Sequence, residues 1–164
     1  MRTAIALLLL GALWLPRALA APAEQVALII PGSAIGLARL GMTEPELSAV
    51  NGRSACPVTA AYRRGRAVRL ATVWGVACQT AGGSSVGLGF SRVKAEYGEP
   101  DKVRHDTTYP NSFAVWIDYY RPGIAFRVLT VPGDRATLVT AIAVFPAGDR
   151  EAALMDGSSP TAVR

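Results

Sequence analysis

Large apolar residues recur at every second position in two stretches of the chain, which is the pattern of a β-strand with one buried face. Residues 124–128 have the sequence IAFRV, with Arg127 between apolar neighbours. Residues 67–70 have the sequence AVRL and place Arg69 at the corresponding polar position. The pattern predicts a strand in each stretch and directs the Arg69 side chain to solvent.

Turn-forming residues and shorter apolar runs predict the neighbouring strands. Arg64-Gly65 and Arg121-Pro122-Gly123 are the expected turns before the two strands above. Pro132-Gly133-Asp134 predicts a later turn. Additional strands are expected at residues 26–30, 58–62, 73–79, 113–119 and 138–145.

Two short helices are predicted between the strands. Thr43 followed by Glu46 has the spacing of a capping box, and Gly52 is the expected left-handed stop of that helix. A second helix is expected to follow Gly89 and to end at Gly98.

These helices and strands recur in the same order, which indicates an internal repeat. Residues 41–52 align with residues 87–98, with coincident glycines at both ends. Residues 62–70 align with residues 120–128, sharing Tyr, Arg, Gly, Ala and Arg. Because two blocks match in the same order, we predict two copies of one helix-plus-meander unit.

The predicted fold is α+β, with two tandem helix-plus-antiparallel-meander repeats that form one curved sheet with helices on one face. The domain is expected to span residues 21–146, with repeat one at about 32–80 and repeat two at about 81–146. Residues 147–164 contain Gly157-Ser158-Ser159-Pro160 and are expected to form a disordered tail.

The repeated unit resembles a known family. The glycine-ended helices in residues 35–52 and 86–100, with the two Tyr-Arg-x-Gly segments, are similar to the tandem-repeat fold of the secreted β-lactamase inhibitory proteins. The same kind of unit occurs singly in the small lipoprotein of the outer-membrane barrel-assembly machinery. The resemblance covers roughly residues 32–145 and implies this fold and a binding role. Asn51 stands where an apolar or small residue is commoner, and no lipid-attachment cysteine is present.

The first twenty residues have the pattern of a cleaved secretory signal peptide. Arg2 supplies a positive charge, and the apolar run Ala4–Leu15 is shorter than the roughly 20 residues that a membrane-spanning helix needs. Ala18-Leu19-Ala20 supplies small residues for cleavage after Ala20. We therefore expect a periplasmic or secreted protein with no transmembrane segment in the mature chain.

Charge and composition exclude several classes of function. The 164 residues include 17 Lys and Arg against 12 Asp and Glu, a net charge of +5. Arg2 and Arg17 lie in the leader, so the mature chain keeps an excess of only +3. This balance does not favour nucleic acid as a partner. One His and two Cys are too few for a metal cluster, and no cofactor is predicted.

The two cysteines fit an oxidising compartment. An even number of cysteines in a secreted chain favours a disulfide, here between Cys56 and Cys78. The competing interpretation is metal or redox work, but the chain contains no C-x-x-C motif. The sequence therefore predicts a structural Cys56–Cys78 bond.

One segment matches a catalytic motif. Gly83-Ser84-Ser85-Val86-Gly87 fits the G-x-S-x-G nucleophile elbow, with Ser85 at its centre and His105, the single His, as the available base. The same residues have the composition of a linker between repeats, and such short motifs often occur by accident. A small serine hydrolase that uses Ser85 and His105 is the alternative function.

Aromatic and arginine side chains that escape the buried alternation are the predicted partner-binding residues. Trp116 and Tyr119 are three residues apart, so strict alternation exposes one of them unless a bulge or a covering helix buries both. The arginines of the first repeat form either a solvated face or a basic patch for an acidic partner. The candidate set is Tyr62, Arg69, Trp116, Tyr119, Arg121 and Arg127.

The leading prediction is a non-enzymatic module that binds another envelope or secreted protein, as an assembly factor or an inhibitor. The alternatives are the hydrolase above and a small-ligand binder in the cleft between the repeats.

Overall fold

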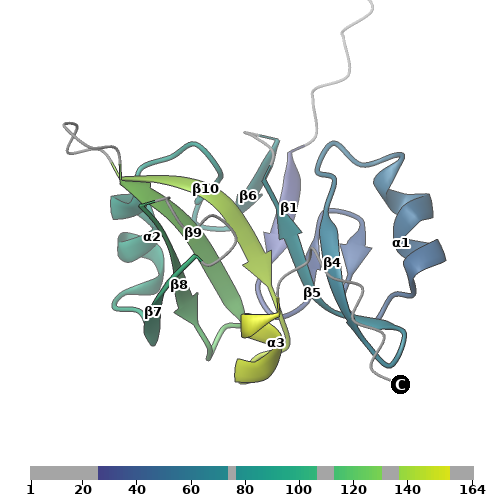
Figure 1. Cartoon of the computed structure of the whole chain (residues 1–164). Coiled ribbons are helices and arrows are strands. Elements are labelled where there is room, and N and C mark those ends of the chain that lie inside the picture. Colours follow the sequence, from purple (N-terminus) through teal and green to yellow (C-terminus); the bar gives the residue numbers. More distant parts are fainter. Residues whose placement is uncertain (1–25, 74–76, 107–112, 131–136, 156–164) are drawn as a thin grey trace, which may run out of the picture.

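Two β-sheets make up most of the protein. The computed structural model describes residues 26–73, 77–106, 113–130 and 137–155 (Figure 1). The strands are β1 (Ala27–Ile30), β2 (Ala34–Ile35), β3 (Ala38–Arg39), β4 (Thr59–Arg63), β5 (Arg66–Thr72), β6 (Cys78–Thr80), β7 (Lys102–His105), β8 (Ala114–Tyr119), β9 (Ile124–Thr130) and β10 (Thr137–Val144). The helices are α1 (Glu44–Asn51), α2 (Phe90–Tyr97) and α3 (Arg150–Leu154).

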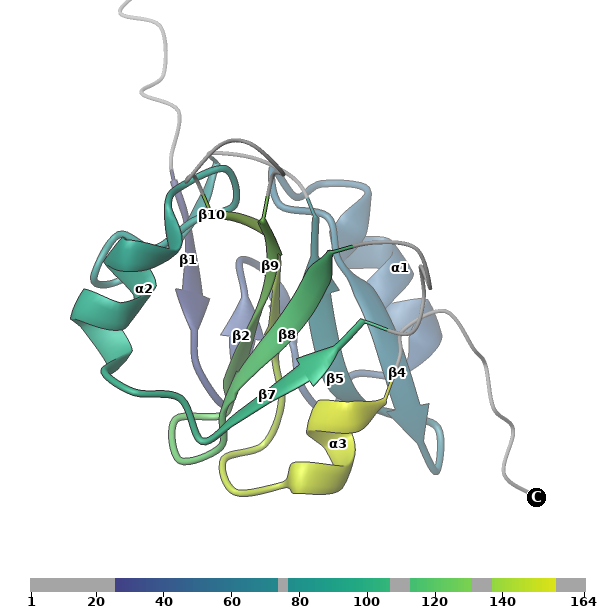
Figure 2. The same ribbon diagram turned by 60° about the vertical axis from the view of Figure 1, so that its left-hand side comes forward.

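The strands divide into a small and a large sheet. The small sheet has four strands in the order β3-β2-β1-β6, and the large sheet has six in the order β4-β5-β10-β9-β8-β7. Within the small sheet β1 runs parallel to β6, and the large sheet is antiparallel throughout. Figures 1 and 2 show the small sheet behind the large one, with α1 and α2 at opposite ends.

The predicted α+β fold of two helix-plus-meander repeats is therefore wrong. Strands dominate the described residues, and the three helices have only eight, eight and five residues. The predicted repeats do not form separate meanders, because β10 lies between β5 and β9 and joins both hairpins in one sheet. The helices also do not share a face, because α3 packs on the side opposite α1 and α2.

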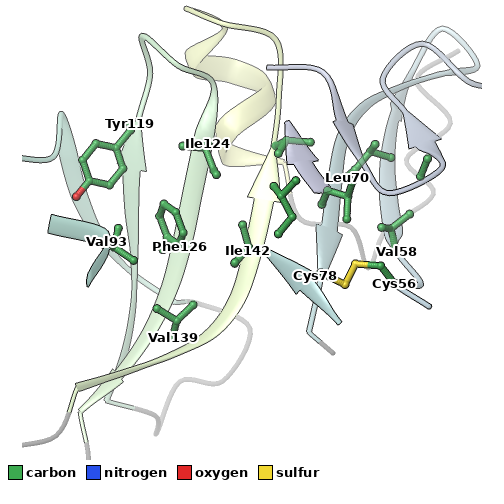
Figure 3. Close-up of a cluster of buried hydrophobic side chains, with 14 of the residues drawn as sticks. Cys56, Val58, Leu70, Cys78, Val93, Tyr119, Ile124, Phe126, Val139 and Ile142 are labelled. Carbon is green, nitrogen blue, oxygen red and sulfur yellow. A yellow bond between two sulfur atoms is a disulfide. The ribbon is translucent and has the colours of Figure 1, made fainter. Parts of the chain in front are cut away.

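The main core lies between the two sheets (Figure 3). The large sheet contributes the alternating residues Ile124, Phe126 and Val128, as the period of two predicted. Leu47 of α1 and Val93 of α2 cover its two ends. Fully burying side chains of this size stabilises the fold by about 1.5–3 kcal/mol each.

The helix ends follow the sequence signals in part. Thr43 and Glu46 form the predicted capping box, in which the Thr43 backbone N–H donates to the Glu46 carboxylate at 2.7 Å. Gly98 ends α2 with a positive φ of 76°. Gly52 does not form the predicted left-handed stop, because its φ is −63° in the right-handed region.

Strand β5 contains an extra residue, and the Val68 side chain therefore points to the opposite face from the one that alternation predicts. Ala61 pairs with Arg69 while Tyr62 pairs with Ala67, so Val68 is the added residue of a β-bulge. Strict alternation would place the Val68 and Leu70 side chains on the same face of β5, and the bulge interrupts that alternation. Leu70 joins the main core, whereas Val68 packs on the opposite face of the sheet.

The disulfide prediction is confirmed. Cys56, which precedes β4, is bonded to Cys78 in β6, and both side chains are fully buried. The bond links the large sheet to the small one across the core (Figure 3). In the part of the chain that the structure describes, none of the helices combines the length and apolar character that crossing a membrane requires.

The segment predicted to be a disordered C-terminal tail contains a short helix. Residues 150–154 form α3 rather than part of a disordered tail, whereas residues 156–164 lie outside the described residues. The predicted signal peptide, residues 1–20, and the Pro132-Gly133-Asp134 turn also lie outside them.

Candidate functional site

A stacked arginine–tryptophan cluster occupies the face of the large sheet that turns away from the main core. Trp116 of β8 lies between Arg69 of β5 and Arg104 of β7, whose guanidinium carbons are 4.5 and 5.4 Å from the indole ring centre. Both distances are within the range of cation–π attraction. Arg69 is only 2% exposed and Trp116 only 6%. We call Arg69, Arg104, Trp116, Asp118 and Tyr120 the arginine–tryptophan cluster.

Alanines between the outer strands make room for this stack. Strands β10 and β9 separate β5 from β8, and three of their residues on this face are alanines, Ala143, Ala141 and Ala125, all buried. Small side chains there let Arg69 and Trp116 meet above the sheet instead of being held apart.

A buried carboxylate anchors the cluster. Asp118 is fully buried and accepts a hydrogen bond from Arg104 Nε at 3.0 Å and a long one from the Tyr120 hydroxyl at 3.5 Å. Its other oxygen, Oδ1, has no hydrogen-bond partner among the described residues. An incompletely satisfied buried charge costs stability, so this arrangement is not an optimal core.

A second ion pair lies further along the same face. Arg127 Nε donates to Asp106, and Arg127 Nη1 donates to the Thr140 hydroxyl at 3.2 Å. Thr140 is the extra residue of a bulge in β10, which brings its hydroxyl to Arg127. Arg127 is therefore engaged within the protein.

Helix α3 covers this face. Ala152 and Ala153 are completely buried against the cluster and Phe145. Arg104 Nη2 donates to the Ala153 carbonyl at 2.8 Å, and Arg63 of β4 contacts Asp149 Oδ2 at 3.1 Å. The two edge strands of the large sheet, β4 and β7, thus both hold α3 (Figure 2).

The six predicted partner-binding residues do not line one open face. Trp116 and Tyr119 are both buried, on opposite faces of β8, because α3 covers one face and α2 the other. Burial raises the pKa of Tyr119 to about 12, and nearby Glu99 adds to the shift. Arg69 is buried, and Tyr62 packs against the main core. Of the six, only Arg121 is exposed, and Arg127 is half-buried.

The basic cluster of the first repeat is largely neutralised by acidic neighbours. Arg63 contacts Asp149 and, at 3.3 Å, Glu151. Arg66 donates to the Gly41 carbonyl at 3.1 Å and lies 3.9 Å from Glu46. These contacts indicate that Arg63 and Arg66 stabilise the fold at a solvated surface, and they do not favour a basic patch for a partner.

Exposed aliphatic side chains gather instead on the outer face of the small sheet. Val26, Leu28 and Ile30 are 50%, 47% and 44% exposed and alternate along β1 and the residue before it. Register places Gln79 beside Leu28 and Ala34 beside Ile30. We call Val26, Leu28 and Ile30 the β1 stripe. Sequence alone predicts a strand at residues 26–30 but not its exposed face, because these residues have the same apolar character as core residues.

A hollow of about 540 Å³ lies between α2 and the preceding turn, lined by Gly82, Ser91, Arg92, Ala95 and Glu96. The Glu96 carboxylate accepts hydrogen bonds from the hydroxyls of Ser84 at 2.6 Å and Thr80 at 2.7 Å, and from the Gly82 N–H at 3.1 Å. Partial burial raises the pKa of Glu96, but these bonds together outweigh it and hold the pKa below 4.5. The carboxylate is thus committed to fastening the turn to α2.

The residues of the alternative hydrolase lie in different parts of the fold. Ser85 is buried and its backbone bridges Gln79 beside the small sheet, whereas His105 is exposed in β7 at the edge of the large sheet. Nor do the described residues include a group of three or more His, Cys, Asp or Glu side chains that could hold a metal ion.

Comparisons with protein-family models, with curated proteins and with solved structures found no match to this chain.

Proposed function

We propose that the protein is a non-enzymatic binding module of the bacterial periplasm or of a secreted fraction, acting on another protein as an assembly factor or an inhibitor. The observation that carries the proposal is the β1 stripe, where three large aliphatic side chains alternate on one strand and remain about half exposed. Apolar side chains grouped in this way favour a protein contact, whereas single exposed ones need no explanation.

The surroundings of the β1 stripe fit a protein partner. Gln79, beside Leu28, and Arg39, which pairs with Ala34, supply polar groups on the same face. An apolar centre with a polar rim is the usual anatomy of a protein interface. We expect the partner to present a complementary row of apolar side chains.

Two features support the compartment. The first twenty residues have the composition of a secretory leader, and the buried Cys56–Cys78 disulfide is typical of proteins that fold in oxidising surroundings. The two features together support an extracytoplasmic site of action.

Site-specific photo-crosslinking in the intact producing cell tests the proposal. A benzoylphenylalanine at position 28 should give adducts of one discrete mass, and Ile30→Glu should abolish them. The matched control carries the probe at Val103, which is 57% exposed but lies in the large sheet. Equal adducts from positions 28 and 103, or none from position 28, would contradict a partner at the β1 stripe.

A further inference from the structure

Helix α3 is a short segment held almost entirely by the sheet beneath it. It has five residues, far fewer than the roughly 12–15 at which an isolated helix becomes even marginally stable in water. Its helical form therefore depends on the surface on which it sits. We call that surface, formed by Arg63, Arg104, Tyr120 and Phe145 over the alanines of β9 and β10, the α3 seat.

The α3 seat recognises α3 through three kinds of contact. Arg63 binds the acidic side chains of Asp149 and Glu151 at the start of the helix. Ala152 and Ala153 pack without any exposed surface against the aromatic and alanine side chains.

The third contact is at the other end of the helix, where Arg104 Nη2 donates to the Ala153 carbonyl. The seat thus selects an acidic start, two small central residues and a free carbonyl at the end.

The α3 seat is separable from the main core. The apolar residues under α3 form their own cluster, distinct from the one between the two sheets. None of the α3 residues belongs to the cluster between the two sheets, so we expect that core to persist when α3 leaves the seat.

We propose that the α3 seat is a docking site for a short acidic helical segment of another protein, with small residues at its centre, and that α3 is the internal occupant with which this segment competes. The chemistry of the partner is that of α3 itself, since α3 shows what the seat accepts. This surface is separate from the β1 stripe, so either proposal can fail alone.

The test uses the full mature chain with Trp74→Phe, which leaves Trp116 as its single tryptophan. Ala152→Glu with Ala153→Glu should unseat α3 and raise acrylamide quenching of Trp116 fluorescence at least twofold. Leu154→Glu is the matched control, because Leu154 is 47% exposed on the same helix and its replacement should leave quenching unchanged.

The probe is a synthetic peptide with the sequence of residues 146–156. It should restore the parental quenching of the unseated variant saturably, whereas a scrambled peptide should not. Replacing the two acidic residues that contact Arg63 by their amides should weaken peptide binding at least threefold. The parent should need at least tenfold more peptide, because its own α3 is present at high effective concentration.

Several results would overturn the proposal. These are unchanged quenching in the unseated variant, quenching that the peptide does not reverse, or equal peptide affinity for parent and variant. A parent that elutes as a dimer, dissociated by the two glutamates, would assign the seat to α3 of a second copy. If the double variant loses its thermal transition, Asp149→Asn with Glu151→Gln replaces it, since that change loosens α3 from outside the buried cluster and leaves Arg63 of the seat in place for the peptide.

Discussion

At Gly123 the backbone next to the large sheet comes into direct contact with the backbone next to the small sheet. The Gly123 carbonyl accepts hydrogen bonds from the Gly32 and Phe145 N–H groups, both at 3.0 Å, and its φ is 77°. A Cβ at this position would lie 2.9 Å from Gly32 Cα and would collide with the Phe145 carbonyl. Backbone contact of this kind leaves no side chain that could move aside.

We therefore expect Gly123→Ala to cost more than a positive φ alone explains. Gly87→Ala is the matched control, because Gly87 has a φ of 89° and open space around its missing Cβ. The control should lose about 1–2 kcal/mol from the left-handed backbone. Gly123→Ala should lose a further 1–3 kcal/mol or so from overpacking. Urea denaturation of both variants measures the difference, and equal losses would contradict the close approach.

Arg104 and Asp118 form a buried ion pair whose members depend on each other. Arg104→Ala should destabilise the protein by about 3–5 kcal/mol, because it leaves the Asp118 carboxylate buried without its cation. Arg104→Met with Asp118→Leu should cost clearly less than the single change, since neither member of the pair is then left buried without its partner. A double-mutant cycle by chemical denaturation decides this, and additive losses would show that the two side chains are independent.

Among the elements, α2 and the turn before it are fastened by one carboxylate. The pKa of Glu96 lies below 4.5 in the folded protein, so its hydrogen bonds stabilise the fold fully above that pH. Their contribution is lost as the pH falls from 4.5 through the lower folded-state pKa. Asp149 and Glu46 also have lowered pKa values and add to the same acid-side loss.

Glu96→Gln should therefore flatten the fall in unfolding free energy below pH 4.5 without abolishing it. Thermal melts across that range measure the slope. Glu99→Gln is the control, because Glu99 is exposed on the surface after α2 and contacts only Lys94, at 2.8 Å, among the described ion pairs. The assignment is wrong if the two substitutions change the slope equally.

For the whole molecule, the disulfide ties the two sheets together. Cys56 and Cys78 are 22 residues apart and join the segment before β4 to β6. Cys56→Ser with Cys78→Ser should cost about 2–5 kcal/mol of stability. Denaturation midpoints of the oxidised parent and the double variant test this. The Gly123 and Arg104 effects should persist in that background, because neither residue contacts the bond.

Local patterns sufficed for several elements. Three features involve residues only a few positions apart: the capping box of α1, the glycine that ends α2 and the alternation of β9. They can therefore be predicted without knowing the tertiary structure. The disulfide followed from a count of two cysteines and from a predicted secretory leader. None of these signals depends on which surface another element covers.

Local sequence patterns could not predict the candidate site. Arg69 points away from Leu70 as alternation predicts, but α3 and Trp116 cover that face and bury it. The added residue Val68 changes face, and alternation cannot anticipate such a bulge. Alternation left open whether one of Trp116 and Tyr119 is exposed or a covering element buries both, and α3 and α2 bury both by covering the two sides of β8. The exposed residues of the β1 stripe have the same apolar character as core residues, so sequence does not distinguish them.

The sequence by itself determined helices α1 and α2 and most of the hairpin strands, because those depend on neighbouring residues, and the cysteine pair, because the chain has only two cysteines. Helix α3 lies in the segment that was predicted to be a tail. Only the tertiary structure decided the sheet arrangement. Pairing β1 with β6 and inserting β10 between β5 and β9 join segments far apart in the chain. Such pairings depend on which apolar faces remain to be buried once the local hairpins have formed. That requirement belongs to the whole molecule, and it also decides that α3 covers the arginine–tryptophan cluster while the β1 stripe stays open.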